Sequence, residues 1–390
     1  MPTDVSVSFV LATHNRRAIT LDTLNNLLTT GRPTSPFEVI VVDNASTDGT
    51  AQAVRTQFPT VTLLAEAQNL GSCAKALGVD RAAGRFVVFL DDDSYPRPGT
   101  IDRMIEHFEA DPQLAAAGFR VHLPDGREEC SALPNVFVGC GVGFQAEALT
   151  EVGGLDRTFF MQAEEYDLSF KLINAGWKVQ TFADLHVEHL KTPRARRSGR
   201  TVFYDTRNNL ILADRYLSEP YRTLYRQDWL QRYGWLAAGD RRYAALACGA
   251  LAGTWRGLWD RAAYAERRLQ PSAFETLFRM QFVRDHMQRV KEAGAGRIVL
   301  ADLGKNVLAF YQAAEAVGLT VTAIGDDRFA ASGRRYRGLP VVTLDDALQT
   351  RPDAVVVANT SPIHAAATRR RLAARFVGPV HCWFAAAWDR

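Results

Sequence analysis

The sequence has no apolar run long enough to cross a membrane as a helix, for which about 20 consecutive apolar residues are needed. Its nearest candidate, residues 243–255, is short and rich in alanine and glycine. A charged and apolar leader is also missing, because the chain runs directly into a strand pattern. We therefore expect a cytoplasmic protein, with membrane contact limited to a peripheral one at the inner face of the cell membrane.

Paired cysteines are missing as well. The chain has five cysteines without a short repeated spacing: Cys73, Cys130, Cys140, Cys248 and Cys382. This argues against a zinc site or a disulfide framework and for a reducing compartment. A formal net charge of +3 gives no indication of a nucleic-acid partner, and we expect none.

The composition is that of a globular protein with more than one domain. Of its 390 residues, 47% are hydrophobic and 23% are charged, which allows a sizeable core. A chain of this length usually forms two or three domains. We place the first at residues 1–210, a helical segment at 211–293 and a second α/β domain at 297–390.

The first part of the chain alternates strands and helices at short spacing. Apolar runs predict strands near residues 5–12, 38–43, 61–65 and 86–90, with helical patterns between them. This alternation is typical of a mostly parallel α/β sheet, whose ligands bind beyond the carboxyl ends of the strands. Polar residues follow three of these strands, so we expect them to meet at one edge.

Three adjacent carboxylates, Asp91, Asp92 and Asp93, follow the last of these strands. Three like charges at the end of a buried strand repel one another and are costly to desolvate without a counter-charge. A divalent cation with oxygen ligands would supply it. The alternative is a solvated acidic turn, but the buried strand favours metal or phosphate chemistry.

The remainder of the chain divides into a helical segment and a second strand-helix pattern. Residues 243–268 are explained either as core helices or as an interface or membrane-surface contact. From Arg297 the pattern predicts a small Rossmann-like unit. Its first loop has one glycine where a dinucleotide fingerprint needs three, so we expect a structural or regulatory module rather than an NAD site.

Six segments in order resemble the inverting GT-A glycosyltransferases of family 2, closest to the rhamnosyl- and galactofuranosyl-transferase branches. The resemblance covers about the first 210 residues, and it is carried by residues 10–16, 41–49, 69–71, 89–93, 164–167 and His189. It implies a GT-A domain, Rossmann-like with a mostly parallel sheet, ahead of the helical segment and the second α/β domain. The likeness of the latter to domains beside sugar-modifying enzymes is at the fold level only.

The resemblance also implies roles for individual residues. Glu165 lies where the family has its catalytic base, usually an aspartate. His189 follows Glu165 by 24 residues, similar to a metal-ligand histidine of the galactofuranosyl branch. The metal ligands would be Asp91, Asp93 and His189, and Asp92 would contact the ribose or the sugar. The nucleotide would be held by Thr13, Asp43, Asn44, Asn69, Gly71 and Lys75, and Tyr204 to Asn208 would border the acceptor site.

The implied reaction is a metal-dependent transfer with inversion, from a UDP- or dTDP-sugar to a hydroxyl of a glycan or lipid-linked glycan. Mn²⁺ or Mg²⁺ would be the cofactor, and an imidazole beside carboxylates suits Mn²⁺ somewhat better. A homo-oligomer is compatible with the helical segment.

Two other functions compete with this hypothesis. A sugar-nucleotide pyrophosphorylase would need a glycine-rich phosphate loop after the first strand, and residues 12–16 contain no glycine. A non-catalytic carbohydrate- or nucleotide-binding protein would not need the full set of Asp91, Asp93, Glu165 and His189.

Overall fold

The computed structural model describes residues 5–190, 198–239 and 241–385, which form two compact units. Unit 1 comprises Met1–Glu129, Asn135–Arg222 and Leu236–Leu269, and unit 2 comprises Cys130–Pro134, Thr223–Trp235 and Gln270–Arg390. Both are α/β units, as the sequence predicted. The predicted domain boundaries stay a prediction.

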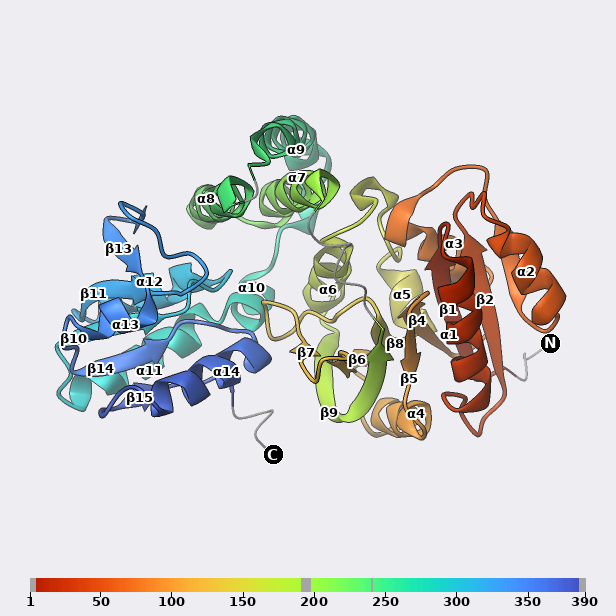
Figure 1. Cartoon of the computed structure of the whole chain (residues 1–390), viewed down its shortest axis with the longest axis horizontal. Helices are drawn as coiled ribbons and strands as arrows, with labels where there is room; N and C mark the ends of the chain where they lie inside the picture. Colours follow the sequence, from red (N-terminus) through yellow and green to blue (C-terminus); the bar gives the residue numbers. More distant parts are fainter. Residues whose placement is uncertain (1–4, 191–197, 240, 386–390) are drawn as a thin grey trace. The chain divides into compact units, whose positions relative to one another are not determined.

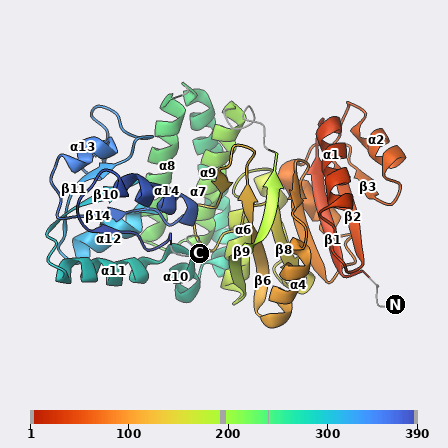
Figure 2. The ribbon, with the colours of Figure 1, turned by 60° about the horizontal axis from the view of Figure 1, so that its bottom comes forward.

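The sheet of unit 1 has nine strands within the described residues, in the order β3-β2-β1-β4-β8-β6-β9-β5, with β7 paired to β6. Figure 2 shows the strands from β3 to β9 side by side. β3, β2, β1 and β4 are parallel, whereas β8 runs antiparallel to β4 and β6. The strands are β1 (Val7–Thr13), β2 (Phe37–Asp43), β3 (Thr62–Ala65), β4 (Phe86–Asp91), β5 (Ser94–Pro96), β6 (Leu114–His122), β7 (Glu128–Glu129), β8 (Gly141–Gln145) and β9 (Lys178–His189).

Helices cover both faces of this sheet (Figure 1). Alternate side chains of β1, β2 and β4 pack in one core with α1, α2 and α4, where Leu24, Leu27, Met104 and Phe108 are buried. The opposite face of β1 contacts α3, where Gly78 lies against Val10. The helices of unit 1 are α1 (Arg17–Thr29), α2 (Thr50–Gln57), α3 (Lys75–Val79), α4 (Thr100–Ala110), α5 (Ala146–Glu151), α6 (Glu164–Asn174), α7 (Gly199–Tyr216) and α9 (Tyr243–Ala263).

Two strands, β5 and β9, connect the aspartates to His189. Ser94–Pro96 forms β5 and pairs antiparallel with β9, although the proline has no N–H to donate. This is compatible with proline because β5 is a short edge strand, where a missing N–H costs little. β9 runs without interruption from Lys178 to His189, and Ser94 pairs with His189 itself. The pairing therefore carries this histidine to the aspartates.

Unit 2 has a six-stranded sheet in the order β12-β13-β11-β10-β14-β15, counted over its described part. Its parallel strands follow the Rossmann order, with β10 between β11 and β14. The strands are β10 (Arg297–Ala301), β11 (Thr320–Gly325), β12 (Arg335–Tyr336), β13 (Leu339–Val342), β14 (Ala354–Val357) and β15 (Val380–His381). The helices are α10 (Pro271–Phe278), α11 (Met280–Glu292), α12 (Val307–Ala316), α13 (Leu344–Leu348) and α14 (Pro362–Ala373).

Unit 2 also takes in two segments from earlier in the chain. Residues 223–235 belong to α8 (Tyr221–Gly239), whose buried Tyr225 and Trp229 bond to Asn306 and to the carbonyl of Lys305 at 2.5 and 3.1 Å. Residues 130–134 are held by Thr360, which donates to a carbonyl there at 2.6 Å. Within the described ranges, no helix combines the length and apolar content that crossing a bilayer requires.

Candidate active site

Three parallel strands of unit 1 bring polar residues to one edge of the sheet. Thr13 at the end of β1 lies beside Asp43 at the end of β2, and Ala12 lies beside Asp91 at the end of β4. Their carboxyl ends meet because neighbouring parallel strands run in register. The convergence expected from the sequence is therefore present, and we call this edge the rim.

Cationic side chains neutralise the aspartates of the rim. Arg16 bridges Asp92 and Asp93, with both N–O distances at 2.6 Å, and buried Lys75 lies 2.6 Å from Asp91. Burial raises the pKa of Asp92 to about 6. The sequence argument that a metal must supply the counter-charge is thus incomplete, because Arg16 and Lys75 already supply part of it.

His189 joins the rim from the end of β9. Its Nε2 lies 3.2 Å from Asp93 Oδ1, and its Nδ1 lies 2.8 Å from Glu129 Oε2 and 3.5 Å from Cys140 Sγ. Burial lowers the pKa of His189, but Cys140, Asp93 and Glu129 outweigh it and raise that pKa to about 12. For Asp93 burial acts in the opposite direction and raises the pKa, but His189 and Arg16 outweigh it and lower that pKa to about 2. Glu129 was not anticipated, since nothing in the sequence links it to the aspartates.

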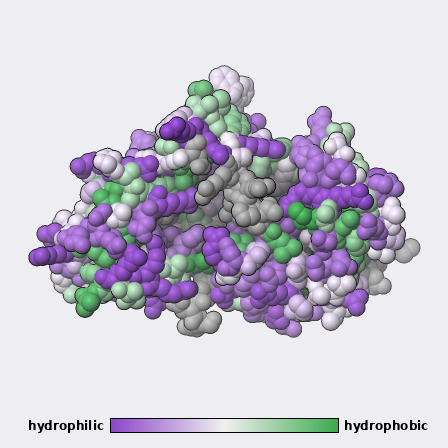
Figure 3. All heavy atoms as spheres, in the orientation of Figure 1, coloured by the Kyte–Doolittle hydropathy of each residue, from purple (hydrophilic) through white to green (hydrophobic). Residues whose placement is uncertain are grey.

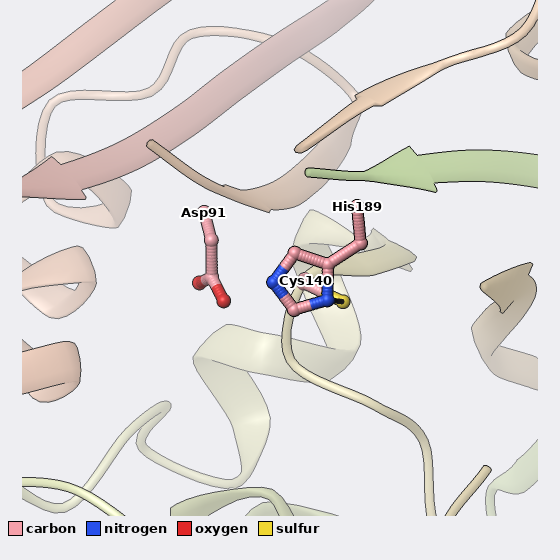
Figure 4. A group of neighbouring side chains, drawn as sticks. All are labelled: Asp91, Cys140 and His189. Atoms are coloured by element: carbon pink, nitrogen blue, oxygen red, sulfur yellow. Dashed lines mark hydrogen bonds between the residues drawn. The ribbon is translucent and has the colours of Figure 1, made fainter. Parts of the chain in front are cut away.

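Three of these groups could hold a metal ion. One ligand atom each from Asp91, Cys140 and His189 lies within 4.8 Å of the others, and Figure 4 shows the Asp91 carboxylate and the His189 ring pointing toward each other. Asp91 and His189 belong to the predicted set. Asp93 instead contacts His189 and Arg16, and Cys140 is an addition. Burial raises the pKa of the Cys140 thiol, which makes it a poorer ligand than the carboxylate and the imidazole.

The residues expected to hold the nucleotide divide into two groups. The side chain of Asn44 is used in internal hydrogen bonds: it donates to the carbonyl of Gly71 and accepts from the N–H of Leu70, at 2.8 and 3.1 Å. Asn69 accepts from the N–H of Gly71 at 2.8 Å. By contrast, Asp43 is buried and its Oδ1 has no hydrogen-bond partner among the described residues. A buried carboxylate oxygen without a partner is costly, so a hydrogen bond from a ligand would stabilise it.

The loop before α6 packs directly on the segment that contains Gly71 and Ser72. A Cβ at Gly71, whose φ is +69°, would lie only 2.0 Å from the carbonyl oxygen of Phe160. Ser72 donates to the same carbonyl at 3.2 Å. Phe160, Gln162 and Ala163 all have φ between 63° and 67°, a left-handed conformation that costs energy for a residue with a Cβ. Other contacts must therefore hold the loop in place.

Asn208 on α7 supplies those contacts. It is buried, and its side-chain amide donates to the carbonyls of Phe159, Met161 and Gln162 at 2.9, 2.8 and 2.7 Å. Tyr204 stacks on the ring of Phe160, with centroids 5.0 Å apart. The segment expected to border an acceptor site thus fixes the loop ahead of α6.

Replacing Asn208 with alanine is expected to reduce the free energy of unfolding by about 1–3 kcal/mol, because buried carbonyls lose their donor. Urea denaturation measures it. The free energy of unfolding of Asn208→Asp should be reduced by as much, since a carboxylate cannot donate to the carbonyls. Exposed Asn25 on α1 is the control, and Asn25→Ala should change the free energy by no more than about 0.5 kcal/mol. An Asn208→Ala effect as small as this would show that the loop is held by other means.

The first turn of α6 carries three carboxylates in different surroundings. The carboxylate of Glu164 is buried and accepts from Ser72, and burial raises its pKa. Asp167 is fully buried and binds Arg215, Tyr216 and Lys171 at 2.7–2.9 Å. Glu165 is half-buried between them in sequence. Both neighbours of Glu165 are thus engaged in internal contacts.

Comparison with known proteins gives one family and several relatives. The model "Glycosyl transferase family 2" matches residues 8–158. An N-acetylglucosaminyl-diphospho-decaprenol L-rhamnosyltransferase of Mycobacterium tuberculosis is 27% identical over 46% of this chain and 76% of its own length. A putative teichuronic acid biosynthesis glycosyltransferase of Bacillus subtilis is 26% identical over 34% of this chain and 59% of its own length.

Among solved structures, a mannosyltransferase from Pyrobaculum calidifontis in complex with GDP-Man and Mn²⁺ is 23% identical, with a TM-score of 0.47, over 71% of this chain and 90% of its own. At this level the likeness does not bear on the chemistry of the rim. The sequence match and the mixed α/β fold agree with the family expected from the motifs. The chain therefore carries a glycosyl transferase family 2 domain, residues 8–158.

Proposed function

We propose that this protein is an inverting, metal-dependent glycosyltransferase that moves a sugar from a UDP- or dTDP-sugar to a hydroxyl of a glycan or lipid-linked glycan. The observation that carries the proposal is the link between the rim and α6. Ser72 binds both Phe160 and Glu164, so the first turn of α6 is tied to the segment beside Asp43 and Asp91. The relative named for a decaprenol-linked diphosphate substrate supports a lipid-linked acceptor at the inner face of the membrane.

In this proposal the nucleotide binds beside Asp43. Its unpartnered Oδ1 would accept a hydrogen bond from the base or the ribose. Asn44, Asn69 and Gly71 would act through the loop that they shape rather than through free side chains. Thr13 donates to Asp92 at 2.8 Å, which orients this carboxylate toward its role at the ribose or the sugar.

The donor set at the rim fits a divalent cation. Asp91 and His189 would hold it, and Asp93 would join them if its carboxylate left Arg16, because carboxylate and imidazole ligands suit Mn²⁺ or Mg²⁺. When bound, the cation would act as a Lewis acid on the departing nucleoside diphosphate. His189 must release a proton to become a ligand, and the ion pair of Lys75 with Asp91 must loosen.

The half-buried Glu165 would act as the general base. The acceptor hydroxyl oxygen attacks the anomeric carbon, the bond from that carbon to the diphosphate oxygen breaks, and the hydroxyl proton passes to Glu165. Because attack and departure occur on opposite sides of one carbon, the configuration inverts.

Thermal denaturation with UDP or dTDP, with and without Mn²⁺, tests this function. A ligand at about 100 times its Kd should increase the free energy of unfolding by about 2.7 kcal/mol. The melting temperature should therefore rise with nucleotide, and rise further with Mn²⁺. Asp93→Ala should remove the Mn²⁺-dependent part. The control is Asp125→Ala, because Asp125 lies in an exposed turn, where it pairs with the guanidinium of Arg127 and accepts a hydrogen bond from the N–H of the same residue.

Several outcomes would contradict the proposal. A full Mn²⁺ effect in Asp93→Ala would remove Asp93 from the metal site, and comparison with Asp91→Ala would show which aspartate binds. Nucleotide binding without release of nucleoside diphosphate from any nucleotide sugar would favour a non-catalytic binding protein.

A further inference from the structure

The outward face of α9 in unit 1 is apolar along its whole length. Four large side chains on it are strongly exposed: Leu251 at 73%, Trp255 at 69%, Leu258 at 52% and Trp259 at 67%. The other exposed residues of the helix are also uncharged, among them Ala244, Ala247 and Ala262. At about 100° per residue these positions share one side of the helix. In Figure 3 green and near-white atoms gather over α9 at the top of the view.

The inward face of α9 is fixed against α7, which keeps the apolar face outward. Gly249, Gly253 and Gly257 are buried there, and a Cβ at each would lie within 2.1–2.7 Å of α7 atoms. Arg261 binds Asp214 of α7 at 2.6 Å, which sets the rotation of the helix. Of the two alternatives for residues 243–268, a core helix therefore describes only the face with the three glycines, because the tryptophans point away from α7.

The charges around this face are basic. Residues 241–268 contain six arginines and two carboxylates, Asp260 and Glu266. Asp260 is buried and bound by Arg215 and Arg256. Arginines lie at both ends of the helix, with Arg241 and Arg242 before it and Arg267 and Arg268 after it. Any partner that covers the face therefore meets positive charge at each end.

We propose that α9 lies in the surface of a bilayer that contains anionic phospholipid. Leucine and tryptophan on one side of a helix flanked by arginine suit the boundary between headgroups and acyl chains. A second copy of the chain fits less well, because antiparallel pairing of two α9 helices would bring arginine ends together. This surface would hold the enzyme beside a lipid-linked acceptor, a consequence that rests on the proposed function, whereas membrane binding does not.

Co-sedimentation with vesicles tests the surface. The full chain is expected to bind vesicles of phosphatidylcholine mixed with phosphatidylglycerol more tightly than vesicles of phosphatidylcholine alone, and salt should weaken the binding. The triple variant Leu251→Gln, Trp255→Gln, Trp259→Gln should lose at least about tenfold in affinity, since burying even one such side chain contributes that much. Val377→Gln is the matched control, because Val377 is a fully exposed hydrophobic residue of unit 2.

Two further measurements separate the outcomes. The nucleotide-dependent rise in melting temperature should be unchanged in the triple variant, so a protein that binds vesicles but not nucleotide would sink the proposed function alone. Equal vesicle binding by wild type and triple variant would overturn the membrane surface. So would a wild-type dimer in sedimentation that dissociates in the triple variant, because a second copy would then cover the face.

Discussion

Replacing Glu165 with glutamine is expected to lower the turnover number by about 10²–10⁴-fold, the usual contribution of a positioned general base. Glutamine keeps the size and much of the hydrogen bonding of glutamate but cannot accept the proton. Nucleotide binding should survive, because the expected nucleotide contacts lie on other loops. The measurement is release of nucleoside diphosphate at saturating donor and acceptor, together with the nucleotide-dependent melting temperature.

The neighbouring carboxylates provide the controls for this assignment. Glu164→Gln should keep more activity than Glu165→Gln, since Glu164 is buried on Ser72. Asp167→Asn should mainly reduce the free energy of unfolding, because Asp167 neutralises buried Arg215. Glu165→Asp should be the mildest of these changes, as it shortens the reach of a carboxylate by one methylene. A fully active Glu165→Gln enzyme would refute the assignment.

The rim could be predicted because it depends on local sequence signals. Buried apolar runs at residues 38–43 and 86–90 indicate parallel strands, and strand direction then sets Asp43 and Asp91 at one edge. The Rossmann-like character of unit 2 follows from a similar alternation of strand and helix patterns. These features need no knowledge of contacts between distant residues.

The surroundings of the rim could not be predicted because they depend on long-range contacts. Pairing of β5 with β9 brings His189 beside Asp93 across almost a hundred residues, and Glu129 reaches His189 from a strand of two residues. The positive φ values of Phe160 and Ala163 have no signature in residue type, and the loop that contains them is held by Asn208 on a distant helix. Residues 223–235 belong to unit 2, although their sequence pattern is that of an ordinary helix and does not indicate which unit they contact.

Arg215 on α7 should be among the most important residues for the stability of unit 1. Its side chain is fully buried and binds Asp156, Asp167 and Asp260 at 2.7–2.8 Å. It also lies over the ring of Tyr264. Burial alone would raise the pKa of Asp156, but the charge of Arg215 and hydrogen bonds from Thr158 lower it to about 2. One guanidinium thus neutralises carboxylates from three segments, including the first turn of α6.

Replacing Arg215 with methionine is expected to reduce the free energy of unfolding by about 3–5 kcal/mol, because it leaves buried carboxylates without their partner. The comparison is Arg157→Met, since Arg157 forms an exposed ion pair with Asp80 at 3.5 Å and should contribute about 0–1 kcal/mol. Urea denaturation followed by circular dichroism measures both. Arg215→Lys should recover only part of the loss, because an ammonium cannot reproduce the fork of contacts to Asp167 and Asp260. If Arg215→Met were no less stable than Arg157→Met, the buried ion pairs would not hold α6 to α7, and the position of Glu165 would depend on the Asn208 loop alone.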